Sequence, residues 1–321
     1  MNLHNDPDGF VALLRIISES TDTRSDILEK DYYVTLFLKE LSEWQGTLPA
    51  YFKGGTALYK ALGSIRRFSE DIDLTVCVDE CSNSQAKSRL DKAANGYRSL
   101  PRTSSKEMES NRKGSIISVY DYKSVIGAFI SDPLQRFNHV KVEATSFTVS
   151  EPFTPLIIAP LIFEKATDDQ KTILQDRYDI FPFSINTIKL ERIFVDKIFA
   201  SEFYYLREEY FDVSKHVYDL TIMSGLEEIQ LLISDPVELT AMMAFKRREE
   251  KLRIGSDLSE KSVSDFAIFE GMRSNKELRD RFISMQNIYI FNDSEKIDFD
   301  HVIGALSSIK DRLLTEICGK R

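Results

Sequence analysis

The chain has 321 residues, enough for about two domains, and it carries a net charge of −9. Hydrophobic residues make up 42% and charged residues 29%, as in ordinary soluble globular proteins. The negative net charge argues against a protein that attracts nucleic acid through its overall electrostatic field, so any nucleic-acid contact would need a local basic patch. The apolar runs are far shorter than the roughly 20 residues of a membrane span. The first residues lack a secretory signal pattern, and we expect a cytoplasmic protein that does not enter a membrane.

The first half of the sequence mixes two kinds of hydrophobic pattern. Periodicity near 3.6 residues predicts helices over 10–18, 25–44, 56–62 and 84–97. Alternation and β-branched residues predict strands over 50–53, 71–78, 115–125 and 135–150. Prolines mark 152–160 and 181–184 as connections, and we place a domain boundary between about 150 and 185.

Beyond that boundary the pattern becomes helical throughout. Helices are predicted over 187–205, 214–223, 235–251, 262–269, 275–289 and 299–318. The predicted fold class is therefore α/β, or α+β, with a mixed sheet, followed by a helical bundle. We assign residues 1–170 to the first domain, with its N-terminal helices, and residues 171–321 to the helical domain.

One stretch, KGGTALYKALGSIRRFSEDIDLTV at 53–76, concentrates residues that bind phosphate and metal. Asp71 and Asp73 are two apart on a predicted strand and therefore project from the same face, about 7 Å apart. A divalent cation such as Mg²⁺ would neutralise their repulsion and could bridge to substrate phosphates. Taken alone, the pair is more typical of two solvated acids at the start of a strand than of a metal site.

The two residues Gly54 and Gly55 precede a predicted helix. Glycines allow the backbone to approach a ligand closely, and the amides of a helix N-terminus favour an anion. The spacing of the Walker A loop is missing. The stretch therefore indicates a phosphate held by the glycine loop and a metal held by the aspartates.

The segment GGTALYKAL…RRFSEDIDL resembles the first motif of the AbiEii/AbiGii-type, MenT-like nucleotidyltransferase toxins, which belong to the polymerase-β-like nucleotidyltransferase superfamily. Three further blocks occur in the order found in that family: EKDYYVT at 29–35, LERIFVDKIFA at 190–200 and KHVYDLTIM at 215–223, where Lys215 takes the place of a common arginine. The resemblance covers roughly residues 25–225 and implies a nucleotidyltransferase-like core in the first half.

The resemblance also implies roles for individual residues. The catalytic set would be Ser69, Asp71, Asp73, Lys197 and Asp219. Nucleotide would be bound by Gly54, Gly55, Thr56, Ser69 and Lys197, the lysine coming from the helical domain into the cleft together with Asp219. Asp219 would either orient Lys197 or act as a base.

In the superfamily a third acid from a neighbouring strand joins the two metal-binding aspartates. Glu143 is the best candidate, because the alternation in HVKVEATSF places it on the polar face beside Lys141. An ordinary exposed strand acid remains the alternative. The metal ligands would then be Asp71, Asp73 and Glu143, with Mg²⁺ as the cofactor and NTP as the substrate.

The resemblance implies that a nucleoside monophosphate is moved to an acceptor hydroxyl. The acceptor would be the 3′ end of tRNA, whose modification blocks translation, and a cognate antitoxin would be the partner. A small-molecule or protein acceptor, or a degenerate module that only binds nucleotide, are the alternatives. The sequence does not identify the preferred NTP, the RNA species, the antitoxin or the oligomeric state.

Three features keep more than one interpretation. Lys30 and Asp31 cannot face one side of a helix together, and we expect them to anchor it against the core. Arg66 and Arg67 either screen phosphates or solvate a loop. The basic stretch 245–253 either meets an RNA backbone or, as we prefer, forms a solvated helix face with Glu–Lys pairs.

Overall fold

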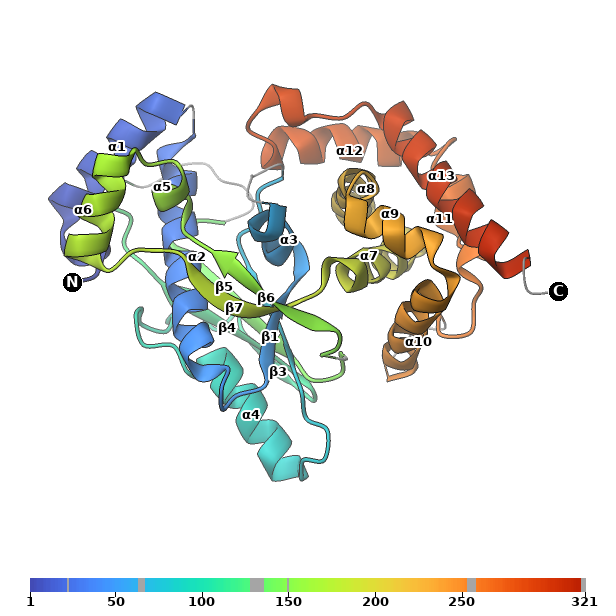
Figure 1. The fold of residues 1–321 in the computed structure, drawn as a ribbon, viewed down its shortest axis with the longest axis horizontal. Helices are drawn as coiled ribbons and strands as arrows, with labels where there is room; N and C mark the ends of the chain where they lie inside the picture. Colours follow the sequence, from blue (N-terminus) through green and yellow to red (C-terminus); the bar gives the residue numbers. More distant parts are fainter. Residues whose placement is uncertain (22, 63–66, 128–135, 149, 253–257, 319–321) are drawn as a thin grey trace. The chain divides into compact units, whose positions relative to one another are not determined.

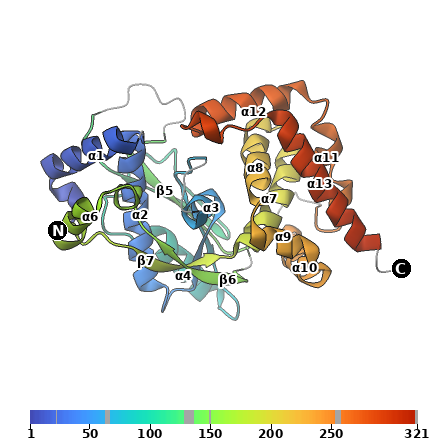
Figure 2. The same ribbon diagram turned by 45° about the horizontal axis from the view of Figure 1, so that its top comes forward.

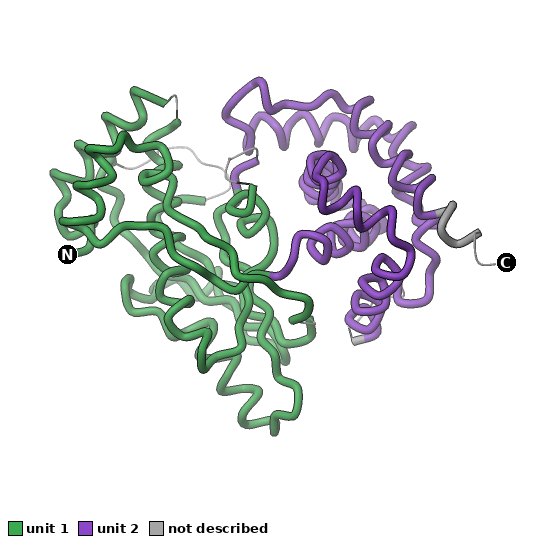
Figure 3. The backbone as a smooth tube through the Cα atoms, viewed as in Figure 1, with its two compact units in different colours: residues 1–64, 69–187 green, residues 65–68, 188–321 purple. Residues whose placement is uncertain are grey.

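The structure is a computed structural model that describes residues 1–21, 23–62, 67–127, 136–148, 150–252 and 258–318. The chain forms two compact units (Figure 3). The first consists of Met1–Ser64 and Ser69–Thr187, and the second of Ile65–Phe68 and Ile188–Arg321. The division of function between residues 1–170 and 171–321 stays a prediction.

The first unit is built on a mixed sheet, which has seven strands within the described residues (Figures 1 and 2). These strands are β1 (Ala50–Lys53), β2 (Ile72–Val76), β3 (Ser110–Arg112), β4 (Ser115–Asp121), β5 (His139–Thr145), β6 (Phe153–Ile158) and β7 (Phe183–Ile188). Their order across the sheet is β3-β4-β5-β2-β1-β7-β6. Because β2 runs antiparallel to β1 and parallel to β5, the predicted mixed sheet is confirmed.

The helices of this unit are α1 (Pro7–Thr21), α2 (Ser25–Trp44), α3 (Gly54–Leu62), α4 (Asn83–Asn95), α5 (Leu161–Glu164) and α6 (Asp168–Tyr178). Helices α2 and α4 cover the apolar face of the sheet. Tyr120 of β4, which pairs with Val140 of β5, packs edge-on against Phe37 of α2 and donates a hydrogen bond to the carbonyl of Ala94 in α4. The opposite face of β1, β2 and β5 is left for polar side chains.

Helix α2 has the bounds that its periodicity predicts, and the adjacent Lys30 and Asp31 within it are both buried. Lys30 Nζ donates to the carbonyl oxygen of His139 in β5. The Asp31 carboxylate lies 2.7 Å from Lys60 Nζ of α3 and accepts from the amide of Leu161 in α5 at 2.6 Å. The predicted anchoring of this helix to the core is confirmed.

Two predicted connections are wrong. Residues 153–158 of the proline-marked segment form strand β6, which tolerates Pro155 because β6 is an edge strand and the missing amide breaks no ladder inside the sheet. The second segment, 181–184, runs into strand β7. Helix α6 was not predicted, since only Leu174 and Tyr178 are buried along it, although its N-terminal capping box was visible in the sequence.

The second unit is helical in its described part, as predicted. Its α-helices are α7 (Leu190–Tyr205), α8 (Tyr210–Met223), α9 (Glu227–Ser234), α10 (Pro236–Leu252), α11 (Ala267–Gly271), α12 (Lys276–Tyr289) and α13 (Phe299–Cys318). Helix α7 packs on α8 to α11, and α8 packs on α12 and α13. None of the helices described in either unit is long and apolar enough to cross a membrane.

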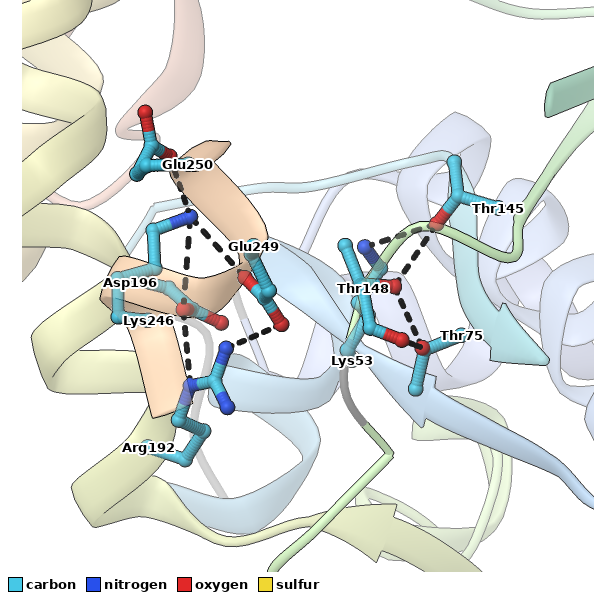
Figure 4. Close-up of polar contacts among 9 residues, drawn as sticks. All are labelled: Lys53, Thr75, Thr145, Thr148, Arg192, Asp196, Lys246, Glu249 and Glu250. Atoms are coloured by element: carbon cyan, nitrogen blue, oxygen red, sulfur yellow. Dashed lines mark hydrogen bonds and ion pairs between the residues drawn. The ribbon is translucent and has the colours of Figure 1, made fainter. Parts of the chain in front are cut away.

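A buried ionic network joins α7 to α10 inside the second unit (Figure 4). Lys246 Nζ lies 2.9 Å from Glu250, 3.2 Å from Glu249 and 3.8 Å from Asp196. Arg192 closes the network through ion pairs with Asp196 and Glu249. The solvated face that we preferred for the basic stretch is therefore wrong for Lys246, Glu249 and Glu250, and Arg253 lies outside the described residues.

Removing the lysine from this network leaves buried carboxylates without their cation, which costs about 3–5 kcal/mol in comparable cases. We expect Lys246→Ala to lower the free energy of unfolding by that order, measured by urea denaturation. Arg248→Ala, at an exposed position of the same helix, should change it by less than about 0.5 kcal/mol. Equal effects of the two variants would contradict a buried network.

Candidate active site

The polar face of the sheet carries a row of charged side chains across three neighbouring strands. Lys53 of β1 lies opposite Asp73 of β2, and Asp73 lies opposite Glu143 of β5. Residues directly opposite each other on paired strands project from the same face. The row therefore brings two of the predicted metal ligands side by side, with a lysine flanking them.

The environment of this row disfavours ionisation of Asp73 beside Glu143. Burial, together with repulsion from Glu143, raises the pKa of Asp73 to about 6, although Lys53 acts in the opposite direction. Lys53 is also occupied elsewhere, since its Nζ lies 3.3 Å from the hydroxyl of Thr145 (Figure 4). A pair of close carboxylates with so little compensation is a place where a cation would stabilise the ionised form.

Asp71 lies next to this row and is paired with a different group. Its carboxylate forms an ion pair of 2.5 Å with Lys141 of β5, and this pairing keeps the pKa of Lys141 above its usual value although burial acts to lower it. Within the described residues, no three acidic, histidine or cysteine side chains are arranged to hold a metal ion. The donor chemistry at Asp73 and Glu143 suits Mg²⁺, whereas Asp71 would have to leave Lys141 to join them.

The glycine loop lies directly against Asp73. Gly54 has a φ of +80°, and a Cβ atom at this position would come within 2.1 Å of the Asp73 Oδ2 atom. Helix α3 starts at Gly54, two residues earlier than predicted, so both Gly54 and Gly55 lie in its first turn. The glycines thus allow the helix N-terminus to begin beside the carboxylate row.

Thr56 and Ser69 lie close together in the same unit. The Thr56 hydroxyl donates to the carbonyl oxygen of Asp71 at 2.6 Å and lies 3.0 Å from Ser69 Oγ. Thr56 is fully buried, whereas Ser69 is half-buried. Thr56 therefore orders the segment that carries Ser69 and Asp71, and its hydroxyl is directed at that segment.

The other predicted residues, Lys197 and Asp219, meet inside the second unit. Lys197 Nζ of α7 donates to Asp219 Oδ2 of α8 at 2.6 Å. Arg67 donates to both oxygens of the same carboxylate, from Nε at 3.0 Å and from Nη2 at 2.7 Å. Burial acts to raise the pKa of Asp219, but Arg67 and Lys197 outweigh it and hold that pKa well below its usual range. A carboxylate with so low a pKa is a poor proton acceptor, which favours the orienting role of Asp219 over the role of a base.

Sequence reasoning did not assign three of these cations to the site. Alternation places Lys141 on the same face as Glu143, but only the structure shows that Lys53 lies opposite Asp73 and that Lys141 pairs with Asp71. Arg67 was weighed as a phosphate screen or a loop residue, and its partnership with Asp219 spans 152 positions. Arg66 lies outside the described residues.

Comparison with known proteins agrees with the motifs. Residues 36–303 match the family described as nucleotidyl transferase AbiEii toxin, type IV TA system. A similar solved structure is MenT4, a nucleotidyltransferase toxin from Mycobacterium tuberculosis H37Rv, at 15% identity and a TM-score of 0.41, with 94% of this chain and 98% of that chain covered. No curated protein matches the sequence.

A carboxylate row beside a glycine turn on a mixed sheet is an arrangement suited to nucleotidyl transfer. The family match spans most of the chain, so the chain belongs to the AbiEii family of nucleotidyltransferase toxins of type IV toxin–antitoxin systems. The predicted family is thereby confirmed.

The close approach of Gly54 to Asp73 can be tested by adding one methyl group. Gly54→Ala places a Cβ against the Asp73 carboxylate and also strains a positive φ, so we expect a lower free energy of unfolding by about 1–3 kcal/mol in urea. Gly46→Ala is the matched control, because a Cβ there meets nothing within 4 Å. If both variants unfold like the wild type, the tight contact is absent.

The raised pKa of Asp73 predicts a pH-dependent stability in metal-free protein. The pKa of this carboxyl is about 6 in the folded protein and 3.8 in the usual case. Its protonation therefore stabilises the fold fully below pH 3.8, and this contribution is lost as the pH rises through about 6. Asp73→Asn mimics the protonated form. We expect this variant to unfold at a higher temperature than the wild type at about pH 8, and at the same temperature at about pH 4. A constant difference at both pH values would contradict the shift.

Proposed function

We propose that this protein transfers a nucleoside monophosphate from an NTP to an acceptor hydroxyl. The hydroxyl oxygen forms a bond to the α-phosphorus, the bond from that phosphorus to the leaving oxygen breaks, pyrophosphate departs, and the hydroxyl proton passes to a base. The observation that carries the proposal is the row of Lys53, Asp73 and Glu143 beside Gly54. On one face of the sheet, a cation could bind at the carboxylates and a phosphate could bind next to it at the glycine turn.

The cofactor in this proposal is Mg²⁺. Asp71, Asp73 and Glu143 would hold it, and it would supply charge neutralisation for the triphosphate. Asp71 is paired with Lys141 at 2.5 Å, and a divalent cation would take the place of that lysine. The raised pKa of Asp73, caused first by burial and then by repulsion from Glu143, supports the same assignment, since a divalent ion would stabilise the ionised carboxylate.

The triphosphate contacts in this proposal are the ones that the resemblance of the motifs implies. The amides of Gly54 and Gly55 at the start of α3 favour a phosphate, and Thr56 supports them by holding the segment that carries Ser69. Lys197 would bind the triphosphate as a compact cation. Asp219 then orients Lys197, because its carboxylate is already committed to two cations.

The acceptor in this proposal is the 3′ end of tRNA, as the resemblance of the four motifs implies. Modification of that end blocks aminoacylation and translation, which would account for toxicity in the cytoplasm and for a cognate antitoxin. The net charge of −9 requires that such an RNA be bound over a limited area. A small molecule or a protein hydroxyl is the alternative acceptor, and a protein that only binds nucleotide is the alternative class.

The first experiment follows the label. The purified protein is incubated with Mg²⁺ and total tRNA, and with each NTP labelled in turn at the α-phosphate. We expect label on tRNA with the α-labelled NTP and none with the same NTP labelled at the γ-phosphate, because the γ-phosphate leaves in pyrophosphate. Asp71→Ala and Asp73→Asn should each lower the rate by at least about 100-fold, the order typical when stabilisation of charge in the transition state is lost.

Asp169→Ala is the matched control, because it removes an exposed carboxylate from the same unit and should leave the rate unchanged. Label on the protein or on a small molecule would retain the chemistry and reject tRNA as the acceptor. Full activity in the Asp71 and Asp73 variants would refute the mechanism. Binding of NTP without any transfer would favour the nucleotide-binding module.

A further inference from the structure

Arg67 and Phe68 form a short segment that belongs to the second unit, although residues 69–187 after it belong to the first. Phe68 is fully buried, and its amide donates to the carbonyl oxygen of Tyr289 in α12 at 2.9 Å. Arg67 is only 9% exposed, and its guanidinium lies 5.9 Å from the centre of the Tyr289 ring. The segment is thus held in the helical unit by both of its described residues.

The strongest polar contact of this segment is made with Asp219. Two nitrogens of Arg67 bind the two oxygens of the carboxylate, a fork that fixes the plane of the carboxylate as well as its position. Lys197 Nζ shares Oδ2 with Arg67 Nη2. The direction in which Asp219 presents Oδ2 to Lys197 is therefore set by the guanidinium. Asp219 is 3% exposed and Lys197 5%, so water competes little for these contacts.

In the chain, Arg67 comes two residues before Ser69 and four before Asp71. Inside the first unit, Thr56 holds Ser69 and Asp71 through its hydroxyl. The contacts of Arg67 with Asp219 lie inside the second unit, where they act on Asp219 and, through it, on Lys197.

We propose that Arg67 is a positioning residue for nucleotidyl transfer: its forked ion pair with Asp219 sets the orientation of Lys197. This inference rests on the proposed function. Lysine cannot replace Arg67 in this role, because a single ammonium group cannot hold both carboxylate oxygens in one plane. Loss of the fork should affect the rate of the reaction more than the binding of NTP, since misplaced groups cost rate steeply.

The test measures kcat and KM for NTP in the label-transfer reaction, with wild type, Arg67→Ala and Arg67→Lys. We expect both variants to lose about 100-fold in kcat with KM changed less than about threefold. Guanidinium chloride at tens of millimolar, compared with sodium chloride at the same concentration, should restore at least a tenth of the lost rate to Arg67→Ala and none to Arg67→Lys, where the ammonium occupies the space. A residue that merely supports folding would not be rescued by a free guanidinium ion.

Arg279→Ala is the matched control, because Arg279 forms an arginine–aspartate pair with Asp300 in the same unit, at 2.5 Å, but at the surface, where the side chains are 40% and 73% exposed. It should keep its rate and should not respond to guanidinium. Wild-type rate in Arg67→Ala, or a loss that guanidinium does not restore in protein that still melts cooperatively, would overturn the inference while leaving the proposed function intact. A wild-type protein that transfers no nucleotide would overturn both.

Discussion

The constraint on which the first unit depends is the register of β2 and β5. Parallel pairing of these strands places Asp73 directly beside Glu143, and two carboxylates so close cannot both ionise without a cost. Burial raises the pKa of Asp73, and repulsion from Glu143 raises it further. The surrounding structure is adapted to it: Lys53 lies on the other side of Asp73, Lys141 takes Asp71 away from the pair, and the helix that follows β1 begins with its positive end at this position.

Buried charged side chains also occur in the second unit, and helix α7 contributes to two separate groups of them. Asp196 and Lys197 are adjacent, so they leave the helix in different directions. Asp196 joins the network that holds α10, whereas Lys197 joins Asp219. The first set fixes the framework and the second is proposed to meet substrate. An acid followed directly by a lysine thus serves two separate groups of charged side chains within one turn.

The sequence predicted the class of the fold and the local contents of the site, but not the contacts between distant segments. Helix 25–44 and the alternating strands were predictable because their apolar periods are strong. Strand β6 was missed because Pro155 was taken as a break, and edge strands are where a proline is tolerated. The pairing of Asp73 with Glu143 was predictable only in part. Alternation within one strand shows which face a side chain occupies, but the register depends on how two strands pair. The Arg67–Asp219 pair could not be predicted, because neither residue carries a local signal for the other.

Arg67 and Phe68 belong to the helical unit, as does the chain from residue 188 onward, whereas residues 69–187 between them belong to the first unit. Neither unit is therefore a contiguous stretch of sequence. A gene fragment that begins at residue 188 would encode the helical unit without Arg67. A fragment that ends at residue 187 would encode the first unit together with Arg67 and Phe68 of the helical unit. The two units cannot be exchanged as modules between proteins by a single recombination event. A hybrid made from two relatives would therefore have to move both segments of the helical unit at once.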